Sequence, residues 1–404
     1  MIKPQTLKGF RDFLPQGAKK RQYVINTLKG VFESYGFEPL ETPALEYEEV
    51  LLGKYGDEGD KLMYRFEDNG QRKIALRYDQ TVPLARVVAQ YQNELSMPFK
   101  RYQIQNVWRA DNTQKGRFRE FLQCDIDTVG QSSRTADAEI IVIIAKSLEK
   151  LGFKNFKILV GDRKLFEGIP QAAITIIDKL KKIGEEKVLA ELKDRGLDEK
   201  ILSKIKNSKP SSDIELILGI AQEFGVADKV YFEPTLARGL NYYTGMILEV
   251  EVEGFNAGSV GGGGRYDNLI GIFAGKEIPA VGFAFGFDRV MEAMDELKLF
   301  PTDLSTTKIL VTVFPASQQG GSKDLLDKSM AVALILRNNG INTELYLDET
   351  AKMEKQLKYA DKKQIPYVAI IGPDEAKNNT VTLRNMKTRE QEVVNSETLV
   401  RKLQ

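Results

Sequence analysis

Helical spacing of apolar residues marks three segments of the chain. Between Ala18 and Tyr35 apolar residues recur every three or four positions, which places them on one helix face, and Gly36 supplies an end signal. A second helix is predicted over Asp137 to Leu151, which is rich in Ile, Val and Ala. Residues 170–228 have helical patterns dominated by Lys and Glu, which are typical of a solvated surface.

Alternating or continuous apolar residues predict strands in two later segments. From Met246 to Glu253 the apolar and acidic residues alternate, as expected for an antiparallel strand. Ala280 to Phe287 has the pattern of a buried strand that passes into a helix, with Arg289 near the start of that helix.

A predicted hairpin over Arg101 to Asp127 carries charge at both ends. A polar loop, Asp111 to Gly116, separates its strands. Arginines flank the loop, and Gln123, Asp125 and Asp127 share one face of the return strand. The arginines are Arg109, Arg117 and Arg119, and the apolar members of the return strand are Phe118, Phe121 and Leu122. This arrangement suits a zwitterion beside a polyphosphate, although an antiparallel pair with charges on its wet face has the same pattern.

Two further runs contain candidate binding residues. Residues 238–245 (RGLNYYTG) place an arginine and two tyrosines just before a strand. An arginine can bind phosphate through two parallel hydrogen bonds, and tyrosines provide flat apolar walls with a polar tip. The four glycines at 261–264 either let the backbone approach a ligand or form a flexible turn. No Gly-Lys-Ser/Thr follows them, which excludes a P-loop.

A domain boundary is predicted near Phe300 to Thr307, where Pro301 and polar residues form a linker. Strands and helices alternate beyond it, which predicts a small α/β domain with a mostly parallel sheet. The expected elements are a strand at Ile309–Phe314, a helix at Lys323–Asn338, a strand at Thr343–Leu347, a helix at Lys352–Gln364 and a strand at Tyr367–Ile371. From residue 305 on, 15 Lys and Arg stand against 12 Asp and Glu, a mild positive bias that permits phosphate contacts.

Composition excludes several kinds of site. The 404 residues suggest two or three domains, and a net charge of +1 does not mark a strongly basic nucleic-acid binder. The chain has no histidine, which excludes histidine bases and histidine metal ligands, and its one cysteine, Cys124, excludes an internal disulfide. Apolar runs are too short for a membrane span and the N-terminus lacks a secretory signal, so we expect a cytoplasmic protein.

Several of these segments resemble the histidyl-tRNA synthetase family of class II aminoacyl-tRNA synthetases, over essentially the whole chain. The Tyr-Tyr and Gly-rich runs are similar to those of histidyl members in particular. Four segments are similar to the family's N-terminal signature and motifs 1, 2 and 3, respectively: residues 9–15 (GFRDFLP), 37–43 (FEPLETP), 101–127 and 282–289. Residues 76–83 (LRYDQTVP) resemble the amino-acid-binding segment of the family's eukaryote-like branch.

The resemblance implies an α+β catalytic core, with an antiparallel sheet and flanking helices, in residues 1–169 and 229–300. It also implies a helical insertion at 170–228, a linker at 301–307 and an α/β anticodon-binding domain at 308–404. Motif 1 implies a homodimer. The implied partners are tRNA(His), histidine and ATP, with Mg²⁺ bridging the ATP phosphates.

The implied reaction is activation of histidine by ATP, followed by transfer to the 3'-terminal adenosine of tRNA(His). Arg109 and Arg238 are the catalytic candidates on the α-phosphate. The ATP-binding candidates are Arg109, Asp111, Arg117, Phe121 and Arg289. The histidine-binding candidates are Asp79, Thr81, Gln123, Asp127, Arg238, Tyr242, Tyr243, Gly262 and Gly263. Gln114 and Lys115 are expected at the tRNA acceptor end, and no metal site built from protein side chains is expected.

Two positions depart from the family's pattern: Asn241 stands where aspartate is more usual, and Asp111 where many bacterial members have glutamate. Two alternatives stay open. One is a noncatalytic paralogue that regulates histidine biosynthesis; such paralogues generally lose the anticodon domain and the Arg238 region, both of which this chain keeps. The other is a class II synthetase for another amino acid, against which the Tyr-Tyr run argues.

Overall fold

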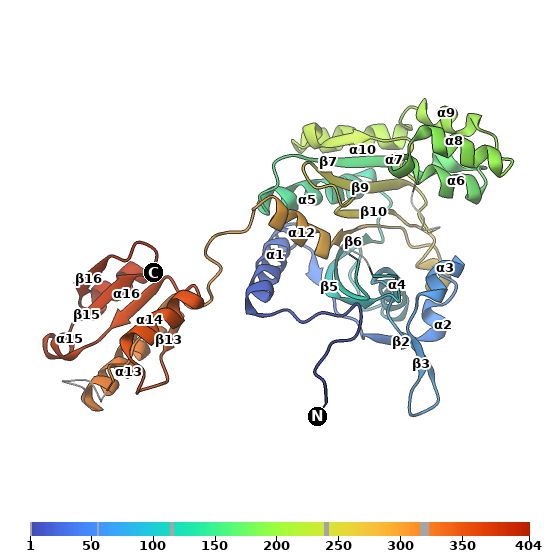
Figure 1. Ribbon diagram of the computed structural model, residues 1–404. Coiled ribbons are helices and arrows are strands. Elements are labelled where there is room, and N and C mark those ends of the chain that lie inside the picture. Colours follow the sequence, from blue (N-terminus) through green and yellow to red (C-terminus); the bar gives the residue numbers. More distant parts are fainter. Residues whose placement is uncertain (1, 55, 114–116, 238–241, 316–322) are drawn as a thin grey trace. The chain divides into compact units, whose positions relative to one another are not determined.

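The computed structural model describes residues 2–54, 56–113, 117–237, 242–315 and 323–404. It divides into two compact units, Met1–Phe300 and Pro301–Gln404 (Figure 1). Among the helices of these ranges, none combines the length and the apolarity that crossing a membrane requires.

An eight-stranded sheet forms the centre of the first unit, in the order β1-β5-β6-β11-β10-β9-β7-β8. Its neighbours are antiparallel, except for the outermost pairs β1·β5 and β7·β8, which are parallel. The strands are β1 (Glu38–Pro39), β5 (Phe99–Trp108), β6 (Glu120–Val129), β7 (Phe156–Asp162), β8 (Val230–Phe232), β9 (Met246–Val252), β10 (Gly261–Arg265) and β11 (Ala280–Gly286). The predicted α+β core with an antiparallel sheet is confirmed.

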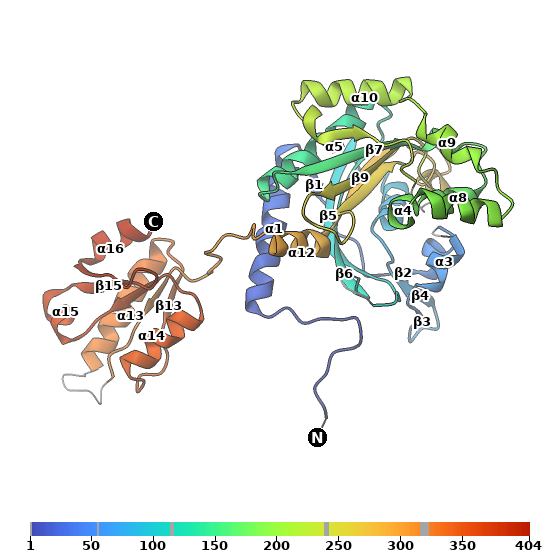
Figure 2. The same ribbon diagram turned by 45° about the horizontal axis from the view of Figure 1, so that its top comes forward.

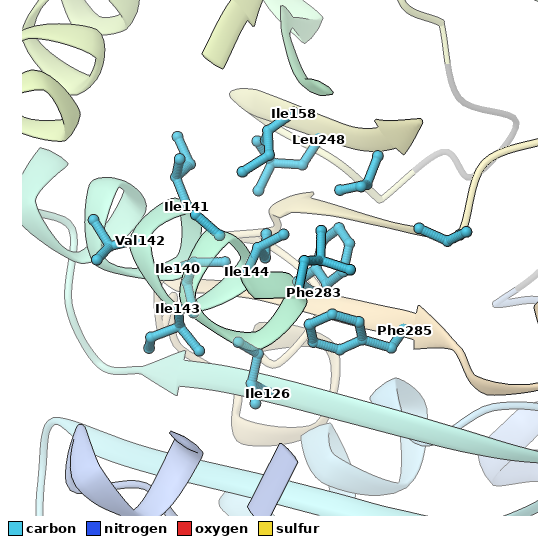
Figure 3. Packing of buried hydrophobic residues seen from close by; sticks show 14 of the residues in the cluster. Ile126, Ile140, Ile141, Val142, Ile143, Ile144, Ile158, Leu248, Phe283 and Phe285 are labelled. Atoms are coloured by element: carbon cyan, nitrogen blue, oxygen red, sulfur yellow. The ribbon is translucent and has the colours of Figure 1, made fainter. Parts of the chain in front are cut away.

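Helix α5 (Arg134–Lys150) covers one face of this sheet. Ser133 caps its N-terminus by accepting a hydrogen bond from the Ala136 N–H. Figure 3 shows its isoleucines packed among side chains of the sheet: Ile126 of β6, Ile158 of β7, Leu248 of β9, and Phe283 and Phe285 of β11. Each such fully buried side chain stabilises the fold by about 1.5–3 kcal/mol.

Other helices pack around the same core. They are α1 (Pro15–Ser34), α10 (Ser212–Glu223) and α12 (Phe287–Glu296), and α10 lies against α5 (Figure 2). The predicted face of α1 is confirmed, because Val24, Leu28 and Phe32 are fully buried. The helix ends before Gly36, whose φ of +76° suits glycine.

A small three-stranded sheet and three short helices adjoin the main sheet. They are β2 (Leu45–Tyr47), β3 (Arg65–Glu67), β4 (Lys73–Leu76), α2 (Glu48–Leu51), α3 (Gly56–Lys61) and α4 (Thr81–Gln90). The short α11 (Gly271–Ala274) packs against α4.

The Lys- and Glu-rich stretch is helical, as predicted, but it packs in two places. Helices α6 (Gln171–Ile177), α7 (Leu180–Ile183), α8 (Glu185–Asp194) and α9 (Lys200–Lys206) gather around a small apolar cluster of their own. Helix α10 instead contributes Ile214, Ile217 and Ala221 to the main core. Short 3₁₀ turns, Arg163–Phe166 and Ala227–Lys229, flank this stretch.

The second unit has a five-stranded sheet in the order β13-β12-β14-β15-β16. The strands β13, β12 and β14 are parallel, whereas β15 and β16 add as antiparallel strands. The expected α/β domain is therefore confirmed. Its sheet is mixed, with two parallel and two antiparallel pairings, so the parallel arrangement holds for the three expected strands and not for the pairings that β15 makes. The elements are β12 (Ile309–Val311), α13 (Lys323–Asn338), β13 (Thr343–Leu345), α14 (Met353–Lys362), β14 (Tyr367–Ile370), α15 (Pro373–Asn378), β15 (Val381–Asn385), β16 (Gln391–Val394) and α16 (Ser396–Leu403).

Candidate active site

A cavity of about 410 Å³ lies on the face of the main sheet that α5 leaves uncovered. Side chains alternate along β6, so Cys124 and Ile126 point into the core while Gln123, Asp125 and Asp127 line the cavity. The neighbouring strand β11 contributes small residues to the same face, which leaves room above the sheet for a ligand.

Each of the three polar residues of β6 faces a small residue across the strand pair. Gly286 lies opposite Gln123, Ala284 opposite Asp125, and Gly282 opposite Asp127. Gly282 is needed for space, because a Cβ atom there would lie 1.9 Å from Asp127 Oδ1. The next strand, β10, consists of the predicted glycine run, which is a paired strand rather than a turn.

Arginines gather at the end of the cavity near Gln123. Arg109 directly follows β5, its Nε donates to the Tyr78 carbonyl at 3.0 Å, and its guanidinium lies 5.2 Å from the centre of the Phe121 ring. Arg289, the third residue of α12, donates from Nη1 to the Ser259 carbonyl at 2.8 Å. Arg109 and Arg289 are both held by backbone carbonyls, which are uncharged. The positive charges of the two side chains therefore stay available to a ligand.

Arg117 and Asp111 form a bidentate ion pair at the open side of the cavity. Arg117 Nε lies 2.9 Å from Asp111 Oδ2, and its Nη2 lies 3.1 Å from Oδ1. Just before the loop, the two strands of the hairpin are joined by Trp108, whose Nε1 donates to Glu120 Oε2 at 2.9 Å. The predicted strand position of Phe118 is wrong, because β6 begins at Glu120.

The far end of the cavity is acidic. Asp127 is 3% exposed, its Oδ2 lies 2.6 Å from Arg101 Nη2, and its Oδ1 accepts a hydrogen bond from the Tyr266 hydroxyl. Burial raises the pKa of Asp127, although Arg101 opposes that rise. Burial likewise raises the pKa of Tyr266 well above its ordinary value, and the negative charge of Asp127 adds to the effect. The Tyr266 hydroxyl is therefore a stable hydrogen-bond donor.

Tyrosine rings border the acidic end. The ring centres of Tyr242 and Tyr243 are 4.8 Å apart, and Tyr266 meets Tyr242 edge to face at 5.9 Å. Burial raises the pKa of Tyr242 well above its ordinary value. Asp79 also lines this end of the cavity. Its Oδ1 accepts a hydrogen bond from the Val82 N–H at 3.1 Å, in the first turn of α4.

A buried polar network fixes the strand next to β6. Gln103 of β5 donates from Nε2 to Thr42 Oγ1 at 2.8 Å and to Gln105 Oε1 at 2.6 Å. Arg77 donates from Nη1 to the same Gln105 oxygen at 2.9 Å. These contacts tie the motif 1 and motif 2 segments together beneath the cavity.

The N-terminal segment reaches the cavity wall through Asp288. Arg11 and Arg21 lie 2.8 Å and 3.1 Å from its two carboxylate oxygens. The Arg11 guanidinium also lies 3.2 Å from the centre of the Phe118 ring. These contacts position the start of α12, and with it Arg289.

The cavity brings together every predicted site residue that the structure describes. Those residues are Asp79, Thr81, Arg109, Asp111, Arg117, Phe121, Gln123, Asp127, Tyr242, Tyr243, Gly262, Gly263 and Arg289. Arg238, Asn241, Gln114 and Lys115 lie outside the described residues. Asp125, expected with Asp127 as one of the carboxylates beside a zwitterion, also lines the cavity. Other lining residues had been assigned no role, among them Ser259, Tyr266, Gly282 and Asp288.

Within the described ranges, no group of three or more carboxylate or cysteine side chains is arranged to hold a metal ion.

Comparison with known proteins identifies the family. A histidyl-tRNA synthetase family model matches residues 9–207 and 184–290, and an anticodon-binding-domain model matches residues 310–404. The chain belongs to the histidyl-tRNA synthetase family.

Individual relatives match this chain over nearly their whole lengths. A protein named histidine–tRNA ligase from Christiangramia forsetii is 40% identical to this chain, and the match covers 96% of each sequence. A protein of the same name from Cytophaga hutchinsonii is 39% identical, and the match covers 100% of each sequence. The crystal structure of histidyl-tRNA synthetase from Nostoc sp. PCC 7120 matches with a TM-score of 0.87 and 31% identity, over 100% of this chain and 99% of that one. A Bacillus halodurans structure titled as an ATP phosphoribosyltransferase regulatory subunit/histidyl-tRNA synthetase shares the fold, with a TM-score of 0.70 and 22% identity over 88% of this chain and 97% of that one.

Proposed function

We propose that this chain ligates histidine to tRNA(His). It activates histidine with ATP, giving histidyl-adenylate and pyrophosphate, and then transfers histidine to the 3'-terminal adenosine. One observation carries the proposal: a single cavity has carbonyl-anchored arginines at one end and buried carboxyl groups with tyrosine rings at the other. That polarity suits a zwitterionic amino acid whose ammonium group lies at the acidic end and whose carboxylate meets the phosphates of ATP.

In the first step the histidine carboxylate attacks the α-phosphorus, pyrophosphate leaves, and negative charge grows on the phosphoryl oxygens. Arg109 and Arg238 stabilise that charge, and a preorganised donor of this kind contributes about 3 kcal/mol. Arg117 and Arg289 bind the distal phosphates. We propose that ATP replaces Asp111 as the partner of Arg117, which frees Asp111 for the adenine edge. Phe121 stacks on adenine, and Mg²⁺ held by the ATP phosphates would neutralise part of their charge.

Histidine binds at the acidic end. Its α-ammonium group is held by Asp79, Thr81, Gln123 and Asp127, and Tyr242 and Tyr243 wall the imidazole. The backbone of Gly262 and Gly263 closes over the substrate. Gln114 and Lys115 of the motif 2 loop touch the tRNA acceptor end.

The remaining assignments follow family membership. We propose that residues 1–169 and 229–300 form the catalytic core, 170–228 an insertion near the tRNA acceptor arm, 301–307 a linker and 308–404 the anticodon-binding domain. Residues 76–83 are the amino-acid-binding segment of the eukaryote-like branch. The protein acts as a homodimer in the cytoplasm.

The test is amino-acid-dependent ATP–pyrophosphate exchange with each of the twenty amino acids. Exchange with histidine alone, reduced about 10²–10³-fold in Arg109→Ala, supports the proposal. Absence of exchange with any amino acid would favour the regulatory paralogue, whose fold this chain shares. Exchange with another amino acid would mean that the cavity selects a different side chain.

A further inference from the structure

One side chain of the N-terminal segment contacts both arms of the arginine end of the cavity. Arg11 Nη2 lies 2.8 Å from Asp288 Oδ2, and the Arg11 guanidinium lies 3.2 Å from the centre of the Phe118 ring. Phe118 directly follows Arg117, and Asp288 directly precedes Arg289. These four residues line the cavity, whereas Arg11 is not among the residues that line it. Arg11 therefore bridges, from outside the cavity, the two segments that carry Arg117 and Arg289.

The backbone of the same segment is fixed to the motif 2 hairpin. The Arg119 N–H donates to the Gly9 carbonyl at 2.9 Å, and the Arg119 carbonyl accepts from the Arg109 N–H at 2.9 Å. Gly9 has a φ of +88°, and a Cβ atom there would lie 2.8 Å from Arg119 Cγ and 2.9 Å from Thr113 Cγ2. This close approach requires glycine, and it fixes the place of Arg11 beside the hairpin.

An aromatic ring and a second arginine restrict the Arg11 side chain further. The centre of the Phe13 ring lies 4.9 Å from the Arg11 guanidinium and 3.9 Å from that of Arg21. Arg21 Nη1 lies 3.1 Å from the other carboxylate oxygen of Asp288. A planar guanidinium can stack on a ring and pair with a carboxylate at the same time, whereas a lysine ammonium group is a point charge. The contacts of Arg11 therefore depend on its shape as well as on its charge.

The charge of Asp288 makes this arrangement important for a polyphosphate. Asp288 is 8% exposed and lines the cavity next to Arg289. An unpaired carboxylate at this position would repel the distal phosphates of ATP. Arg11 and Arg21 together neutralise Asp288 and leave one net positive charge on the cluster, and loss of Arg11 would remove that charge.

We infer that Arg11 is a positioning residue for ATP, because it sets the separation between Arg117 and Arg289 and neutralises Asp288. It acts through these residues and touches neither substrate. This inference rests on the proposed function, which assigns the distal phosphates to Arg117 and Arg289. The N-terminal segment thereby takes part in recognising the pyrophosphate portion of ATP, and it has no part in recognising adenine or histidine.

The test compares ATP with AMP, which lacks the distal phosphates. The dissociation constants of both nucleotides are measured by titration calorimetry with Mg²⁺, in wild type and in Arg11→Ala. We expect the ATP constant to rise about 10- to 100-fold in Arg11→Ala, while the AMP constant and the histidine KM in ATP–pyrophosphate exchange change less than about threefold. Arg11→Lys keeps the charge but loses the planar stack, so its ATP constant should lie between those of wild type and Arg11→Ala.

Lys20→Ala is the matched control. Lys20 pairs with Asp295 of α12, and its ammonium group lies 4.8 Å from the centre of the Phe300 ring. The substitution removes a cation, an ion pair with α12 and a ring contact, as Arg11→Ala does, but none of the three residues lines the cavity. Both dissociation constants should keep their wild-type values, and thermal melting verifies that each variant is folded.

Three results would overturn the inference. An unchanged ATP constant in Arg11→Ala would show that Arg11 does not act on the phosphate site. An equal rise for ATP and AMP would mean general damage to the cavity, and an equal effect of Lys20→Ala would mean that only the net charge of this surface matters. Failure of the proposed function looks different, because the wild type would then show no histidine-dependent exchange, whatever the calorimetry of Arg11→Ala gives.

Discussion

Asp125 shows how a residue that lines the cavity can weaken the fold that holds it. Burial raises the pKa of its carboxyl group well above the ordinary value; Arg101 and Arg109 oppose the rise, and Asp127 and Asp79 add to it. The charged groups around it belong to β5, the residue that follows β5, β6 and the segment before α4, so none can be changed without affecting the cavity. The folded protein therefore contains an unfavourably placed acid.

We predict that Asp125→Asn stabilises the unliganded protein at pH 7, because burial penalises the charged form of the carboxyl group and an amide carries no charge. The unfolded carboxyl group ionises near pH 3.9, whereas the folded one holds its proton to higher pH. Wild-type stability therefore falls as the pH rises above that value, and the variant escapes this loss.

Melting temperatures of the two proteins between pH 4 and pH 7 provide the measurement. The difference should be small at pH 4 and should grow toward pH 7. If Asp125→Asn had a lower melting temperature than wild type at pH 7, Asp125 would stabilise the protein in the absence of ligand.

At the residue scale, the sequence predicted the positions of the site residues more readily than the contacts that they make. Alternation correctly placed Gln123, Asp125 and Asp127 on one strand face. Asp125 was expected only as one of the carboxylates beside a zwitterion, because its own contacts depend on donors of β5 that are used elsewhere. Tyr266 was missed because its contact with Asp127 joins residues far apart in sequence.

At the scale of elements, the small residues of β11 determine the depth of the cavity. Glycines conceal strand periodicity, since they have no side chain to alternate, which is why the run at 261–264 also suited a turn. Similarly, β15 and β16 escaped prediction and the second sheet was expected to be mostly parallel. The long helices and the strand at 246–252 were predicted because their apolar spacing is local.

We predict that Gly282→Ala destabilises the protein by about 1–3 kcal/mol and weakens histidine binding. The new methyl group would displace the Asp127 carboxylate, and with it the Tyr266 hydroxyl. Chemical denaturation and the histidine KM measure the two effects.

Gly219→Ala is the control for this substitution. Gly219 lies in α10, and a Cβ atom there would meet nothing within 4 Å. Alanine should stabilise that helix by about 0.5–1 kcal/mol without altering the KM. If Gly282→Ala behaved in the same way, the cavity would tolerate a different position of Asp127.

At the scale of the whole molecule, the division at Phe300 separates the unit that contains the cavity from the unit that matches an anticodon-binding domain. Every residue that lines the cavity lies between Asp79 and Arg289, in the first unit. The second unit has apolar clusters of its own and matches an anticodon-binding domain.

We therefore predict that a chain of residues 1–300 retains histidine-dependent ATP–pyrophosphate exchange within about threefold. Its kcat/KM for charging tRNA(His) should fall on the order of 100-fold, which corresponds to about 2.7 kcal/mol of lost binding. Both assays are run beside the full-length protein. Loss of exchange in the shortened chain would mean that the second unit supports the catalytic site.

The chain contains no histidine, and this has a consequence for the synthesis of the chain itself. Its translation consumes no charged tRNA(His), the product of the reaction proposed here. In a reconstituted translation system without histidine, we expect full-length chain to accumulate as in the complete system, while a histidine-containing control stalls. Equal losses of the two proteins would contradict this expectation.

The tryptophan that joins the strands of the motif 2 hairpin gives the molecule an optical reporter. Trp108 is the only tryptophan in the chain, and it immediately precedes Arg109. Its indole is hydrogen-bonded to Glu120, with the Arg77 guanidinium 5.6 Å from its ring centre, so its emission is sensitive to small movements of the hairpin. Intrinsic fluorescence in a stopped-flow instrument can therefore follow ATP and histidine arriving at the unlabelled enzyme, one step at a time.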